Sequence, residues 1–147
     1  MQYRAKYFKI GELVAPVLLK SVPESTLWLL FDERLLRCAD LIREKYGPCT
    51  VNGSGLVDCG LRDWTSKTGA KYSAHKFGRA LDIHILAIER MCGKDKTAKA
   101  SEYDRVRREL MADIRFNCLN FEKTVSGAPI TWLHCDTFNR PNRLFAA

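Results

Sequence analysis

The segment SAHKFGRALDIH (residues 73–84) contains two of the chain's three histidines, together with an aspartate. Its second half, RALDIHIL (residues 79–86), alternates as a β-strand does, with Ala80, Asp82 and His84 on one side and aliphatic residues on the other. A carboxylate inside an apolar strand is costly to bury without a partner. The segment therefore predicts a strand that carries functional groups on one face.

The third histidine, His134, belongs to TWLHCDTF, and alternation across residues 130–138 predicts a final strand. His75 comes seven residues before Asp82, and Gly78 between them lets the chain turn tightly. Two imidazoles and one carboxylate are the ligand set of a catalytic zinc, with a fourth position left for water. We therefore expect one Zn²⁺ ion bound by His75, Asp82 and His134.

Composition limits the remaining possibilities. The 147 residues are 46% hydrophobic and 28% charged, which predicts one globular domain covering residues 1–147. The formal charge of +7 favours an anionic partner or surface, such as an acidic cell wall. Because the basic residues are scattered and form no known nucleic-acid module, specific nucleic-acid binding is not expected.

The chain shows no sign of a membrane segment or a secretory signal. Its longest apolar run is far too short to span a bilayer, so we expect no membrane insertion. Glu12 interrupts the apolar part of the N-terminus, which predicts synthesis in the cytoplasm without a signal peptide. The six cysteines form no C-x-x-C pair and are expected to be free thiols. We expect a monomer.

Periodicity and turn residues predict a small α+β domain, an antiparallel sheet with helices packed on one face. Gly47 and Pro48 end the first long helix. The predicted elements are an N-terminal segment (1–22) with a short strand around 7–14, a helix over 23–46, a short strand within 49–55, a loop over 56–72, a strand over 79–86, a polar loop over 93–100, a helix over 101–116, a strand over 130–138 and an extended tail (141–147).

The motif S-A-H-K-F-G-R-A-L-D (73–82) resembles the S-x-H-x-x-G-x-A-x-D motif of zinc D-Ala-D-Ala carboxypeptidases and of the related L-Ala-D-Glu and murein endopeptidases. W-L-H-C-D (132–136) resembles the later strand motif that supplies their third ligand. The hedgehog signalling domain shares that zinc fold. The first motif matches at every fixed position, and the resemblance covers roughly residues 25–140.

The resemblance implies the same three zinc ligands and adds two further residues. Arg62 takes the place of an arginine that binds substrate or stabilises negative charge in the family, and a guanidinium suits either role. The alternative for Arg62 is a surface salt bridge. Ser73 matches the serine that lines the substrate site in relatives, and its alternative role is a hydrogen bond that shapes the loop.

The general base is where the chain departs from the family. Many relatives carry an acidic residue three positions before the last ligand, and here that position is Thr131, which has no useful basicity. Asp136, on the same strand face as His134, could be the base. Alternatively it could hydrogen-bond to a ligand residue and orient it without touching the metal. His84 faces the same side as Asp82 and is a second candidate for supporting a ligand, and Glu89 and Glu122 are more distant candidates.

These observations predict zinc-assisted hydrolysis of amide bonds in peptidoglycan stem peptides, with Asp136 and Arg62 as catalytic residues. By analogy, a compact catalytic domain without a signal peptide resembles a phage or prophage lysis enzyme, which acts on the wall after release or as part of a virion. The alternative is a zinc-stabilised binding module of the same fold that lacks turnover. The bond that is cleaved is left open between carboxypeptidase and endopeptidase types.

Overall fold

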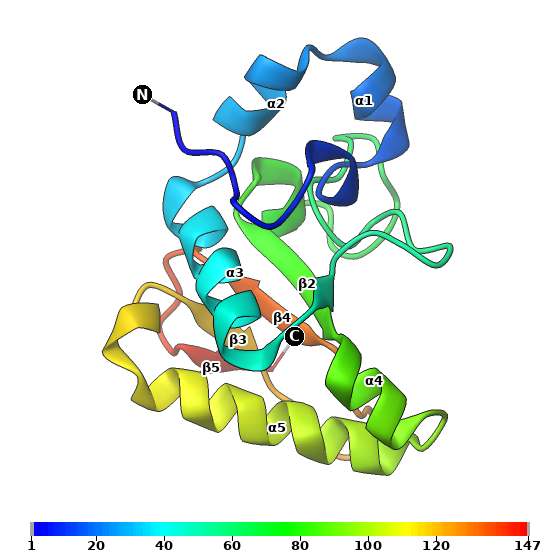
Figure 1. The fold of residues 1–147 in the computed structure, drawn as a ribbon, viewed down its shortest axis with the longest axis vertical. Helices are drawn as coiled ribbons and strands as arrows, with labels where there is room; N and C mark the ends of the chain where they lie inside the picture. The colour runs from blue at the N-terminus through cyan, green and yellow to red at the C-terminus, as the bar shows by residue number, and fades with distance from the viewer. Residues whose placement is uncertain (1, 147) are drawn as a thin grey trace.

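The computed structural model describes residues 2–146, so Met1 and Ala147, the outermost residues of the predicted N-terminal segment and tail, lie outside it. The fold is α+β, with one five-stranded sheet in the order β1-β2-β4-β3-β5 (Figure 1). The strands are β1 (Cys49–Thr50), β2 (Ala80–Ile85), β3 (Asn120–Glu122), β4 (Leu133–Asp136) and β5 (Leu144–Phe145). The helices are α1 (Pro16–Ser21), α2 (Glu24–Leu29), α3 (Glu33–Tyr46), α4 (Leu86–Cys92) and α5 (Lys96–Ala112), with 3₁₀ turns η1 (Ile10–Glu12), η2 (Ala74–Phe77) and η3 (Ile114–Phe116).

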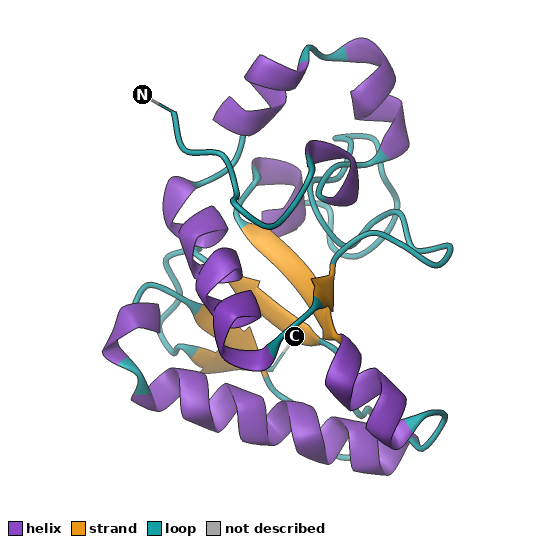
Figure 2. Ribbon diagram, viewed as in Figure 1, coloured by secondary structure: helices purple, strands orange, loops and turns teal. Residues whose placement is uncertain are grey.

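Helices cover one face of the sheet, and the opposite face, called here the Asp82 face, carries the predicted ligands of β2 and β4. Helices α3 and α5 lie against the covered face, as Figure 2 shows. The alternation of β2 places Leu81 and Ile83 there, fully buried beside Leu133 of β4. Each such side chain contributes about 1.5–3 kcal/mol of hydrophobic free energy when it is buried. This burial fixes the register of β2 and therefore turns Asp82 to the opposite face.

The pairing of β2 with β4 brings together two segments far apart in the chain. The strands are antiparallel and Asp82 lies directly opposite His134. Strand β3 pairs on the other side of β4, with Asn120 opposite Asp136. Continued by two residues, this register sets Glu122 opposite His134. Asp82, His134 and Glu122 thus form one row across three strands.

The predicted single helix over residues 23–46 is wrong, because the chain forms two helices there. Asp32 ends the first by acting as the N-cap of α3, where its side chain accepts a hydrogen bond from the backbone N–H of Arg34 (3.0 Å). The backbone N–H of Asp32 donates to the carbonyl of Gly78 (2.9 Å). The break therefore docks the α2–α3 junction against the turn that follows His75.

Three other boundaries differ from prediction. The helix expected over 101–116 begins at Lys96, because Asp95 caps it through the backbone N–H of Ala98 (3.0 Å), so the loop predicted over 93–100 is largely helical. Residues 7–14 form the turn η1 and a single bridge instead of a strand. The tail expected to be merely extended contains β5, which pairs in parallel with β3. No helix within residues 2–146 is both long and apolar enough to cross a membrane.

Candidate metal centre

His75, Asp82 and His134 converge on the Asp82 face of the sheet. Each offers a ligand atom, and the three atoms lie within 4.8 Å of one another. Nδ1 of His134 is 2.8 Å from Oδ1 of Asp82, and Nε2 of His75 is 3.4 Å from Oδ2 of the same carboxylate. The two imidazole rings meet edge to face with their centroids 5.2 Å apart. The structure therefore brings together the three residues that the sequence predicts as ligands.

His75 is positioned by the short turn η2. Ser73 caps this turn by accepting a hydrogen bond from the backbone N–H of His75 (3.3 Å). Gly78 ends it in the left-handed conformation (φ 66°), and a Cβ there would lie 1.9 Å from the carbonyl oxygen of Leu30. Nδ1 of His75 lies 3.0 Å from the carbonyl oxygen of Gly60, which can only accept, so the ring proton sits on Nδ1. Nε2, the other ring nitrogen, faces Asp82.

His134 is held by carboxylates on both sides of its ring. Nε2 lies 3.0 Å from Oδ2 of Asp136, while Nδ1 faces Asp82. Burial of the imidazole would lower its pKa, but hydrogen bonds to Asp136 and Asp82 outweigh burial and raise the pKa of His134 to about 9. Burial likewise would raise the pKa of Asp82, but hydrogen bonds from both histidines keep it well below its usual range. Two carboxylates therefore flank the His134 ring, one at each nitrogen.

The donor set fits a divalent metal ion. Each histidine has its outward nitrogen engaged by an acceptor, Gly60 for His75 and Asp136 for His134, and such partners fix the tautomer of metal-binding histidines. The ligand atoms of a tetrahedral zinc site lie about 3.3 Å apart. The separation between Nε2 of His75 and Oδ2 of Asp82 (3.4 Å) matches this value, and that between Nδ1 of His134 and Oδ1 of Asp82 (2.8 Å) is shorter. Two imidazoles and a carboxylate suit zinc and also other divalent ions.

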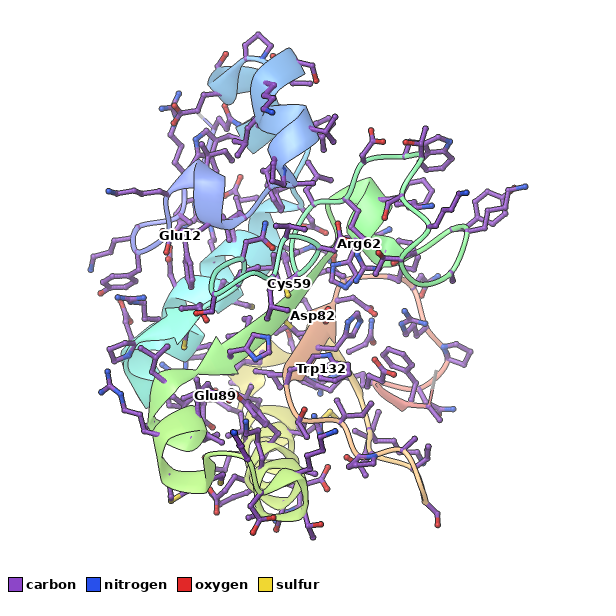
Figure 3. All side chains as sticks on the ribbon, turned by 90° about the vertical axis from the view of Figure 1, so that its right-hand side faces the viewer. Glu12, Cys59, Arg62, Asp82, Glu89 and Trp132 are labelled. Atoms are coloured by element: carbon purple, nitrogen blue, oxygen red, sulfur yellow. The ribbon has the colours of Figure 1, made fainter. Side chains whose placement is uncertain are left out.

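Arg62 and Ser73 also lie at this site, and Arg62 is not the surface salt-bridge residue of the alternative interpretation. The Arg62 side chain is buried, and its Nη2 lies 3.6 Å from Oδ2 of Asp82. Its Nε donates to the carbonyl of Asp58 (2.7 Å), and its Nη1 donates to the carbonyl of Thr68 (3.2 Å) and to Oγ of Ser73 (3.4 Å). Figure 3 shows Asp82 between Arg62 and Trp132. Ser73 both shapes the loop and lines the cavity at the triad.

Asp136 occupies a position that favours an orienting role over that of a general base. Its carboxylate is fully buried and lies on the far side of the His134 ring from Asp82. It accepts hydrogen bonds from Nδ2 of Asn120 (2.9 Å), the backbone N–H of Phe138 (3.2 Å) and the guanidinium of Arg140 (2.7 Å). Burial would raise the pKa of Asp136, but these hydrogen bonds and the one from His134 lower it to about 2. A carboxylate so fully occupied is a poor proton acceptor.

Glu122 is the acidic residue that the structure adds to the site. With Arg62, Ser73 and the triad, it lines a cavity of about 460 Å³. Within residues 2–146 no hydrogen bond or ion pair holds its carboxylate. Sequence reasoning treated Glu122 as distant because it missed β3. The signal was present in L-N-F-E (119–122), where two apolar residues alternate with two polar ones, and the apolar pair is fully buried.

The other two candidates lie outside the triad. Nδ1 of His84 is 3.5 Å from Oε1 of Glu89 in α4, and the role predicted for His84 in supporting a ligand stays a prediction. Glu89 is also bound by Nζ of Lys99 (2.7 Å) and by the hydroxyl of Tyr103 (2.8 Å). Figure 3 places Glu89 well away from Arg62 and Asp82. Glu89 therefore serves as an anchor between α4 and α5.

Comparisons of this chain with models of protein families, with curated proteins and with solved structures found no match.

Proposed function

We propose that this protein is a zinc-dependent peptidase that hydrolyses amide bonds in peptidoglycan stem peptides. The observation that carries the proposal is the convergence of His75, Asp82 and His134, with the outward nitrogen of each imidazole held by an acceptor. The motif around residues 73–82 supports the substrate class through its resemblance to wall peptidases. The net charge of +7 supports it as well, because it favours contact with an anionic wall.

The triad would hold the metal, and the surrounding residues have separate roles. When bound, a divalent ion supplies a Lewis acid and lowers the pKa of water to near neutrality. Asp136 would hold the Nε2 proton of His134, so that Nδ1 is the ring nitrogen that would bind the metal. Arg62 directs its Nη2, the nitrogen without a hydrogen bond within residues 2–146, toward the triad. That guanidinium is placed to stabilise negative charge developing on a substrate carbonyl oxygen.

Glu122 is the proposed general base in place of Asp136. Glu122 lines the triad cavity, the continued β3–β4 register sets it opposite His134, and no partner within residues 2–146 holds its carboxylate. Such a group can accept a proton from water and pass it to the leaving amine. A zinc-stabilised binding module, the alternative function, gains no support from this arrangement, because a module has no need of an acid at this position.

Zinc-loaded protein incubated with purified peptidoglycan tests the proposal, with mass spectrometry of the released muropeptides. We expect cleavage of stem peptides that a chelator abolishes and added zinc restores. His75→Ala should abolish it as well. If the protein binds one zinc per chain but cleaves nothing, the peptidase proposal is wrong and the binding module is the better description. Release from the cytoplasm and a phage or prophage setting remain predictions from the sequence.

A further inference from the structure

Two cavities meet at the triad, one on each side of Asp82. The first, of about 460 Å³, is the one that Glu122 lines. The second, of about 430 Å³, is formed by the loop from Gly55 to Cys59 together with Thr68 and His84. The two have three walls in common, namely Arg62, Asp82 and Trp132. A chain bound across the triad can therefore continue into a cavity in either direction.

The two cavities differ in chemistry, which suits two different parts of one substrate. On the first side Tyr72 and Phe138 add aromatic surface beside Glu122. On the second side Leu56 and Val57 are each 46% exposed and present an aliphatic surface next to the carboxylate of Asp58. Exposed aliphatic side chains at the rim of a polar site are typical of a surface that binds a ligand.

Neither cavity offers a cation to hold a free carboxyl terminus. Among the residues that line them, the guanidinium groups belong to Arg62 and Arg140. Arg62 has its Nε and Nη1 bound to protein oxygens, and only Nη2 remains, directed at the triad. Arg140 donates hydrogen bonds from its Nε and Nη2 to Oδ2 of Asp136 (2.9 and 2.7 Å). Recognition of a terminal carboxylate usually uses a free two-pronged guanidinium, and none is found among the residues that line the two cavities.

Resting on the function proposed above, we infer that the protein is an endopeptidase, which cuts an internal amide bond of a stem peptide and binds residues on both sides of it. Water adds to the carbonyl carbon, the C–N bond breaks, and the leaving amine takes a proton. The products are one peptide with a new carboxylate and one with a new amine. A carboxypeptidase would instead release a single terminal residue from a free carboxyl end.

Two synthetic stem pentapeptides test this inference with the zinc-loaded full-length protein. They are L-Ala-γ-D-Glu-L-Lys-D-Ala-D-Ala with a free carboxyl terminus and the same peptide with a terminal amide. We expect both to be cut at the same internal bond, with kcat/KM values within about 3-fold of each other. The reason is that no cation lining the cavities binds the terminal carboxylate. Loss of cleavage by 100-fold or more on amidation, or release of terminal D-Ala alone, would overturn the endopeptidase inference and leave the peptidase standing.

A binding measurement checks the second cavity without relying on turnover. Calorimetry with the amidated peptide and zinc-loaded Glu122→Gln protein gives a Kd, which the added Leu56→Ala change should weaken 3- to 10-fold. Ile114→Ala is the matched control, since Ile114 is 81% exposed and lines neither cavity. If the Leu56→Ala and control proteins have equal Kd values, the second cavity does not bind the peptide and this part of the inference is wrong. Cleavage of neither peptide by protein with one bound zinc would overturn the proposed function, and this inference with it.

Discussion

Replacing Asp136 by asparagine is the sharpest way to separate an orienting carboxylate from a general base. The change is isosteric, and the asparagine oxygen can keep the contacts of Oδ1 with Asn120 and the backbone of Phe138. The amide NH₂ then takes the place of Oδ2. There it faces Nε2 of His134 at 3.0 Å and the guanidinium of Arg140 at 2.7 Å, so donors oppose donors.

The histidine can escape this conflict by moving its proton. If Nε2 of His134 accepts a hydrogen bond from the new amide, the proton resides on Nδ1, the nitrogen that faces Asp82 and must be unprotonated to bind a metal. Loss of such a partner typically costs 10- to 100-fold in metal affinity, or about 1.4–2.7 kcal/mol. We expect Asp136→Asn to bind zinc 10- to 100-fold more weakly than the wild type.

The assay is competition for zinc against a chromophoric chelator, at a temperature where circular dichroism shows the variant to be folded. Asp40→Asn is the matched control, because Asp40 is a buried carboxylate that accepts hydrogen bonds from the backbone N–H groups of Lys6 (2.8 Å) and Tyr7 (3.1 Å), on the other side of the sheet from the triad. Its zinc affinity should equal that of the wild type. A folded Asp136→Asn protein whose affinity stays within 2-fold of wild type would refute the orienting role.

Three further predictions concern the base, the turn and the thiols. Glu122→Gln should keep one zinc per chain but lower kcat by about 10²–10⁴-fold in the muropeptide assay, and an unchanged kcat would eliminate Glu122 as the base. Gly78→Ala should lower the free energy of unfolding in urea by at least about 2 kcal/mol, because its Cβ would collide with the Leu30 carbonyl in a left-handed backbone, and wild-type stability would contradict the geometry. A hydrogen bond with the neighbouring Cys38 thiol lowers the pKa of Cys118, whereas burial raises the pKa of Cys49 to about 11. Iodoacetamide at pH 8 should therefore modify Cys118 faster than Cys49 by peptide mass mapping, and faster labelling of Cys49 would be the opposite of what the structure predicts.

The triad could be found from the sequence because its signals are local. His75 and Asp82 belong to one motif with a glycine between them, and strict alternation gives the face of each strand. The opposition of Asp82 and His134 follows once both strands share a sheet, since each must bury its aliphatic side. The ligand set was therefore within reach of periodicity and resemblance alone.

The proposed general base and the helix boundaries depended on longer-range information. Glu122 lies on a three-residue strand, too short for a reliable period, and its closeness to His134 arises only through pairing with β4. Asp32 and Asp95 are residue types that commonly cap a helix N-terminus. Helical spacing of hydrophobic residues continues across Asp32, which hid the start of α3. Asp95 lies in a polar run, which hid the start of α5. Asp136 was placed on the correct face, while its hydrogen bonds with Asn120 and Arg140 come from segments that no local pattern joins.

Metal analysis of the purified protein is the most direct test of the central claim that His75, Asp82 and His134 bind one metal ion. We predict one zinc per chain by mass spectrometry of the metal content, lost in His75→Ala and in His134→Ala. The matched control is His84→Ala, which removes the remaining histidine and should retain the ion, because His84 pairs with Glu89 outside the triad. Equal zinc content in all three variants, or none in the wild type after incubation with zinc, would contradict the account.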